Sequence, residues 1–155
     1  MYKKILVPLD GSEFSECSLE HVRAITRGDH VPEVILLRVI EPAPEFYLGR
    51  KMGGDFQSKV TEIIVTEAKD YLSKTADGLK KDGITIRTVV IQGKPAEEIL
   101  DYAAKNQVDL IIMTTHGRSG VSRFAFGSVA EKVIRSSPLP VLSISPTGCR
   151  LESIE

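Results

Sequence analysis

The stretch "ILVPLDGSEFSECSLEHV", residues 5–22, indicates how this chain folds. It opens with an uninterrupted apolar run at 5–9, which is typical of a strand buried on both faces of a sheet. Asp10-Gly11-Ser12 supplies turn residues, and Ser12 is a suitable N-cap for a helix. Apolar residues then recur at helical spacing as far as Ile25. The stretch therefore predicts a strand, a tight turn and a helix.

The same alternation continues to the end of the chain. Further strands are expected at 34–40, 84–91, 110–113 and 141–144, and further helices at 58–82 and 95–104 and from Ser128 onward. Ser128-Val129-Ala130-Glu131 fits a capping box at the start of the last helix. Residues 41–57 are rich in Pro and Gly without a clear period, and they predict a long mobile loop, which we interpret as a candidate lid.

Strands alternating with helices indicate an α/β layer fold around a parallel sheet, because each strand is apolar enough to be covered on both faces. Ligands of such sheets bind beyond the carboxyl ends of the strands, where the strand order reverses. If the first and fourth strands are neighbours, Asp10-Gly11-Ser12 and residues 114–117 meet at that point.

Length and composition limit the classes of protein to consider. The 155 residues suit one domain, which we place at 1–146 with a C-terminal tail at 147–155. A net charge of −1 argues against nucleic acid or an anionic membrane as partner. Cys17 and Cys149 lack metal-site or disulfide-framework spacing, so we interpret them as reduced thiols. With no segment of signal or membrane-spanning character, a cytoplasmic protein is expected.

The stretch "TTHGRSGVSRFAFGS", residues 114–128, is the strongest candidate for a binding site. It contains neither the Walker pattern nor GxGxxG, which argues against a P-loop NTPase and a nicotinamide dehydrogenase. Gly127 and Ser128 open a helix, where free amides and the helix dipole favour an anion. Arg118 and Arg123 are either solvated charges or phosphate contacts. Glycine and serine also make plain turns, so a structural loop stays open as the alternative.

Four segments together resemble the universal stress protein family in order and across residues 2–144. They read "YKKILVPLDGSEFSECSLEHV", "ILLRVIEP", "GKPAEEIL" and "VDLIIMTTHGRSGVSRFAFGSVAEKVIRSSPLPVL". The resemblance implies an α/β fold of the adenine nucleotide alpha hydrolase-like type, a doubly wound open parallel sheet of five strands in the order 3-2-1-4-5 with helices on both faces. It also implies a homodimer, here through Val141, Leu142, Ser143 and Ile144. The family has one branch that binds ATP or AMP and one that does not.

The binding branch carries the pattern Gly-x2-Gly-x9-Gly-Ser/Thr after the fourth strand. Gly117, Gly127 and Ser128 match it, whereas Thr114 stands in place of the first glycine. A β-branched side chain there crowds the place where the backbone passes the ribose. Carried over by position, the nucleotide-binding residues are Pro8, Asp10, Val39, Met113, Thr114, Gly117, Arg118, Gly127, Ser128 and Val129.

The resemblance assigns a part of the nucleotide to each group of these residues. Pro8 and Asp10 lie at the adenine end, where the carboxylate accepts from an amino group or hydroxyl, and Val39 presents its backbone to the base. Thr114 and Gly117 flank the ribose and first phosphate, and residues 127–129 hold phosphate through backbone amides and the Ser128 hydroxyl. Without the resemblance, Asp10 is equally a simple turn residue before Gly11.

These features predict a stress-response regulator that binds ATP or AMP, with Mg²⁺ held through the phosphates as the only expected metal. We assign no catalytic residue. One alternative is a dimeric protein-interaction module with an empty site, which Thr114 favours. A second is a slow ATP-hydrolysing enzyme, because positioning and charge alone assist phosphoryl transfer.

Overall fold

The computed structural model describes residues 1–28, 30, 32–42, 46–47, 50–51, 53–115, 127–145 and 149. In chain order its elements are β1 (Lys4–Pro8), α1 (Glu13–Ile25), β2 (Glu33–Ile40), β3 (Phe46–Tyr47), β4 (Arg50–Lys51), α2 (Gly54–Lys80), β5 (Ile86–Gln92), α3 (Pro95–Lys105), β6 (Leu110–Thr114), α4 (Ser128–Ser136) and β7 (Val141–Ile144).

Five of the strands form one sheet in the order β5-β2-β1-β6-β7. Every neighbouring pair in it is parallel, as the sequence predicts. Counted along this sheet alone, the order is 3-2-1-4-5, which confirms the fold expected from the resemblance. The chain leaves β1 toward β2 on one side and returns to β6 on the other, so the strand order reverses between β1 and β6.

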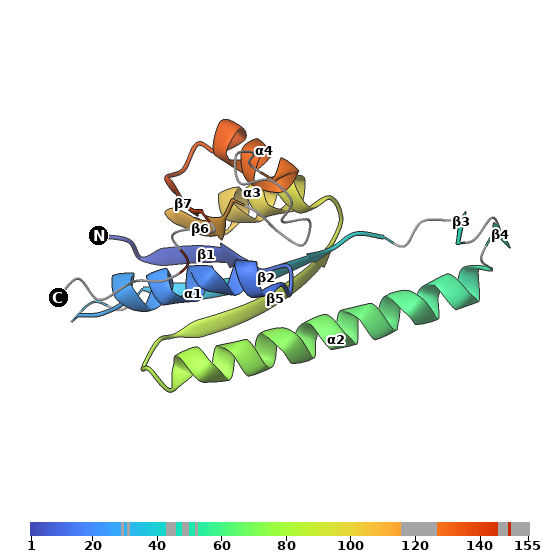
Figure 1. Ribbon diagram of the computed structural model, residues 1–155, viewed down its shortest axis with the longest axis horizontal. Helices are drawn as coiled ribbons and strands as arrows, with labels where there is room; N and C mark the ends of the chain where they lie inside the picture. The colour runs from blue at the N-terminus through green and yellow to red at the C-terminus, as the bar shows by residue number, and fades with distance from the viewer. Residues whose placement is uncertain are drawn as a thin grey trace.

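Helices cover the sheet on both faces, with α1 and α2 on one side and α3 and α4 on the other (Figure 1). Successive strand residues point to opposite faces, so Leu36 packs with Leu72 of α2 while Leu37 packs with Ile99 of α3. The three central strands are almost fully buried. The edge strands β5 and β7 are only partly buried, which corrects the expectation that every strand is covered on both faces. An edge strand has only one neighbouring strand to shield it.

The segment expected to be a loop at 41–57 contains regular structure. Within it, β3 and β4 pair in antiparallel fashion, and α2 starts at Gly54 rather than at residue 58. The expectation was wrong because the first turn of α2 carries no buried apolar residue that a periodic pattern would reveal; Phe56 is 58% exposed. The amino-terminal half of α2 extends past the end of the main sheet toward β3 and β4 (Figure 1).

The two cysteines are joined in a disulfide, which corrects their interpretation as separate thiols. Cys17 lies in α1 and Cys149 follows β7, with 4.9 Å between their Cα atoms across a sequence separation of 132 residues. Sequence spacing gave no sign of this pair because the fold alone brings these two distant segments together. Among the described helices, none combines the length and the apolar character needed to cross a bilayer.

Candidate functional site

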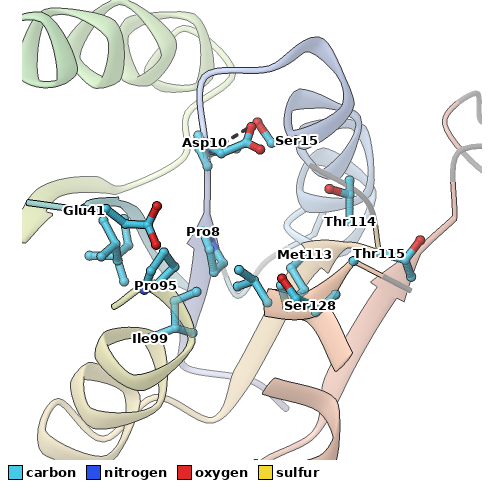
Figure 2. Close-up of a pocket in the computed structure, with 16 residues that line it drawn as sticks. Pro8, Asp10, Ser15, Glu41, Pro95, Ile99, Met113, Thr114, Thr115 and Ser128 are labelled. Carbon is cyan, nitrogen blue, oxygen red and sulfur yellow. Dashed lines mark hydrogen bonds between the residues drawn. The ribbon is translucent and has the colours of Figure 1, made fainter. Parts of the chain in front are cut away.

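A cavity of about 330 Å³ lies at the carboxyl ends of β1, β2 and β6, beside the first turn of α4. This is the place where the strand order reverses. Figure 2 shows three groups of side chains around it: Asp10 with Ser15, then Glu41 with Pro95 and Ile99, and then Met113 with Thr114, Thr115 and Ser128. We call this cavity the strand-end pocket.

One end of the strand-end pocket is an apolar slot. Leu37 and Val39 form one wall at the end of β2, and Pro95 and Ile99 form another from α3. The exposed carboxylate of Glu41 lies at the rim of this slot, directly after β2 (Figure 2). An apolar slot with an acceptor at its rim suits a flat heteroaromatic ring that carries an amino group.

Asp10 is fixed by hydrogen bonds within the turn that joins β1 to α1. Its Oδ1 accepts from the Ser12 amide at 2.8 Å and from the Ser12 hydroxyl. The Asp10 amide donates to Ser15 Oγ at 3.3 Å, and that hydroxyl donates to the Ser12 carbonyl at 2.8 Å. Gly11 permits this turn because its φ is +83°. Asp10 is therefore a turn-maker and a lining residue of the pocket at once.

Ser12 caps α1 as predicted, because its hydroxyl accepts from the Ser15 amide at 3.1 Å. Next to this cap, the Tyr71 hydroxyl of α2 donates to Glu16 Oε1 at 3.0 Å. Burial, and then the neighbouring Glu16 carboxylate, raise the pKa of Tyr71 to about 12, against a partial lowering by hydrogen bonds with Ser15 and Thr75. This contact joins α2 to the first turn of α1, which carries one side of the pocket.

The opposite side of the pocket is formed by the start of α4. Gly127 is its N-cap in an extended conformation, with no side-chain cap bond, and Ser128 is already the first helical residue. The helix begins at Ser128 as predicted, but the expected capping box is wrong because Gly127, not Ser128, is the N-cap. The Glu131 amide donates to the Gly127 carbonyl at 2.9 Å. First-turn amides have no acceptor inside a helix, so this helix start can receive an anion.

The pocket brings together eight of the ten residues predicted for nucleotide binding: Pro8, Asp10, Val39, Met113, Thr114, Gly127, Ser128 and Val129. Gly117 and Arg118 lie outside the described residues, as does Arg123. Among the residues that the structure describes around the pocket, none is a lysine, arginine or histidine. The described part of the chain holds no group of three or more His, Cys, Asp or Glu side chains placed to bind a metal ion.

Sequence reasoning missed several residues that line the pocket: Leu9, Ser15, Leu37, Glu41, Pro95, Ile99 and Ala130. A usable signal existed for two of them. Glu41 directly follows β2, and Pro95 opens the helix that follows β5. Carboxyl ends of parallel strands share one edge of a sheet, so the rule applied to the first and fourth strands also covers these neighbours.

Comparison with known proteins agrees with this geometry. Residues 1–145 match the sequence profile of the Universal stress protein family. Universal stress protein MJ0531 of Methanocaldococcus jannaschii is 34% identical over 144 residues, which cover 93% of this chain and 82% of that protein.

Solved structures show the same fold. The structure of MJ0577, also from Methanocaldococcus jannaschii, superimposes with a TM-score of 0.82 at 36% identity and covers 94% of this chain and 96% of that one. A more distant universal stress protein from Archaeoglobus fulgidus, solved in complex with dAMP, shares the fold with a TM-score of 0.62 at 23% identity, over 92% of this chain and 97% of that one. The family profile covers nearly the whole chain, so this chain belongs to the universal stress protein family.

Proposed function

We propose that this chain binds an adenine nucleotide, ATP or AMP, in the strand-end pocket and acts as a stress-response regulator. The observation that carries the proposal is the chemical division of one cavity. An apolar slot with carboxylates lies at one end, and the start of α4 lies at the other. These two ends suit the base and the phosphate of a nucleotide.

The charges of the pocket support this orientation. The carboxylates of Asp10 and Glu41 suit the amino group of adenine or the hydroxyls of ribose, which donate hydrogen bonds, better than they suit a phosphate. The first turn of α4 carries the positive end of a helix dipole, and the Gly127 backbone allows close approach. Mg²⁺ would bind here through the phosphates of the nucleotide. The Archaeoglobus fulgidus protein, which shares the fold of this chain, was solved in complex with dAMP. This complex supports an adenine nucleotide as the class of ligand.

The test compares a glycine in the pocket with a matched glycine outside it. Gly127 and Gly53 are both N-caps without a side-chain cap bond, with φ, ψ of −61°, 149° and −59°, 145° respectively. A Cβ at Gly53 meets nothing within 4 Å. Gly127→Leu fills the phosphate end of the pocket, whereas Gly53→Leu places the same side chain in the same backbone conformation away from it.

We expect the purified wild-type protein to release ATP or AMP when it is denatured. In a separate experiment, calorimetry on the folded, nucleotide-free protein should show binding of both nucleotides. Gly127→Leu should weaken affinity by about tenfold or more, and Gly53→Leu should leave it unchanged, because only the first places a bulky side chain where the phosphate would bind. Absence of bound nucleotide, together with no thermal shift at millimolar ATP or AMP, would overturn the proposal.

Thr114 favours a second candidate function. Its side chain lines the pocket where the motif of the binding branch has glycine, and it narrows the room for a ribose. A chain with an empty pocket would act as a dimeric protein-interaction module. The absence of nucleotide binding in the experiment above would support this function.

A further inference from the structure

We propose that the Cys17–Cys149 disulfide is a redox modification site that opens by exchange with a dithiol reductant, and that opening it weakens ligand binding in the strand-end pocket. The disulfide joins α1, whose first turn lines one side of the pocket, to the residue Cys149, which follows β7; β7 in turn is hydrogen-bonded to Thr115 on the other side of the pocket. The affinity part of this inference rests on the proposed nucleotide binding; the opening of the bond and its effect on the pocket do not.

On one side, Cys17 lies in α1 close to the hydrogen-bonded turn that holds Asp10. Ser15, two residues before Cys17, lines the pocket and exchanges hydrogen bonds with Asp10 and Ser12. The side chain of Ser18, the residue after Cys17, donates to the Ser15 carbonyl at 2.6 Å. A displacement of α1 at Cys17 therefore reaches Asp10 through a short series of hydrogen bonds.

On the other side, Cys149 is the fifth residue after Ile144, which ends β7. The Ile144 carbonyl accepts from the Thr115 amide at 2.9 Å, and the Thr115 carbonyl accepts from the Gly127 amide at 2.6 Å. Thr115 and Gly127 both line the pocket. The end of β7, five residues before Cys149, is thus hydrogen-bonded to the backbone that places the start of α4.

Exposure determines where the exchange begins. Cys17 is 8% exposed, whereas Cys149 is partly exposed, so a reductant reaches Cys149 first. A thiolate of the dithiol attacks Cys149 Sγ and forms a mixed disulfide, while Cys17 leaves as a thiolate and takes up a proton. The second thiol of the reductant then displaces Cys149. Two electrons and two protons pass to the protein, and the reductant becomes a cyclic disulfide.

Opening the bond removes the covalent connection between the two sides, which then depend on non-covalent packing such as that of Leu19 and Val22 of α1 with Ile144 of β7. A ligand that contacts both sides must then order them when it binds, and this ordering reduces affinity. In a compartment that keeps thiols reduced, the disulfide-bonded form is transient, and the bond forms only under oxidising conditions. The pocket would then bind nucleotide more tightly under oxidising conditions.

The experiment compares the full chain oxidised with glutathione disulfide and the same chain reduced with dithiothreitol. Intact mass and thiol titration check the state of the bond. Calorimetry gives the affinity for AMP, and hydrogen exchange without nucleotide follows the amides of Thr115 and Gly127. We expect reduction to weaken AMP binding by about threefold to tenfold and to speed exchange at both amides.

The variant Cys17→Ser/Cys149→Ser is the matched control, because it should behave as the reduced protein and should not respond to dithiothreitol. Equal affinity and equal exchange in the oxidised and reduced wild type would overturn the inference, as would free thiols that glutathione disulfide does not join. If neither form binds AMP, the proposed function fails. Faster exchange at Thr115 and Gly127 after reduction would still support the coupling of the disulfide to the pocket.

Discussion

At the scale of single residues, the binding mode that we propose places the sugar of the nucleotide beside Thr114. This residue ends β6, and its side chain lines the pocket. Branching at Cβ prevents the side chain from turning aside easily. Threonine in place of glycine at this one position therefore bears on whether the pocket binds nucleotide or stays empty.

We predict that Thr114→Gly strengthens AMP binding by about threefold or more, because removal of the side chain relieves crowding at the ribose. Thr114→Val keeps the branched shape and should leave the affinity near that of the wild type. Calorimetry measures the difference in AMP affinity, and circular dichroism checks that the variants are folded as the wild type is. An unchanged or weaker affinity of Thr114→Gly would show that crowding at this position does not limit binding.

Residue-level reasoning reached part of the pocket for a physical reason. Turn residues after a strand and small polar residues at a helix start are visible in sequence, and Asp10 and Ser128 are examples of the two. Leu37 and Ile99 are ordinary apolar residues that line the pocket because of where their elements pack, so no local signal marks them. The N-cap of α4 also depends on a single backbone conformation at Gly127, which composition does not determine.

At the scale of elements, α1 and α2 are joined by the Tyr71–Glu16 hydrogen bond beside the pocket. The pKa of Tyr71 is raised from 10.0 to about 12. The folded state thus favours the protonated phenol more than the unfolded state does. This contribution to the free energy of unfolding is fully present below pH 10, and it is lost as pH rises toward 12.

We predict that the free energy of unfolding of the wild type falls more steeply than that of Tyr71→Phe as pH rises from 10 to 12. The difference should be on the order of 1 kcal/mol, because Tyr71 is only half-buried and solvent screens its charge. Urea denaturation at several pH values provides the measurement. Parallel pH profiles for the two proteins would contradict the role of this hydrogen bond.

Elements with a clear apolar period were predicted well, and elements without one were not. The strand at Val141–Ile144 matches its predicted limits, because apolar residues fill it and prolines precede it. The first turn of α2 was missed because Phe56 lies exposed and gives no periodic signal. Short strands such as β3 and β4 depend on pairing with each other rather than on their own composition.

At the scale of the whole molecule, the family resemblance implied the order of the strands, whereas nothing in the sequence predicted the disulfide. Handedness rules and parallel pairing leave few topologies for alternating strands and helices. The Cys17–Cys149 bond depends instead on where α1 lies relative to the segment after β7. Nothing local in the sequence records that distance.

We predict that the disulfide stabilises the folded chain substantially. It closes a loop across 132 residues, and loop-closure entropy for that length corresponds to about 5 kcal/mol, of which about 3 to 5 kcal/mol should be measurable. Cys17→Ser/Cys149→Ser should therefore unfold at lower urea than the oxidised wild type and at about the same urea as the reduced wild type. Equal midpoints for the oxidised and reduced proteins would argue against a formed bond.

The β7 edge leads to a final prediction, on the homodimer that we propose for this chain. Pro140 and Ile144 accept hydrogen bonds from β6 through their carbonyls, so by alternation the amide and carbonyl of Ser143 face away from the sheet. An outward-facing edge of this kind pairs readily with a second copy about a two-fold axis. Ser143→Pro removes one outward donor without breaking a bond to β6, and should convert the dimer to a monomer, whereas Ser143→Thr should remain dimeric. Sedimentation analysis measures both, and a Ser143→Pro protein that stays dimeric would exclude β7 as the interface.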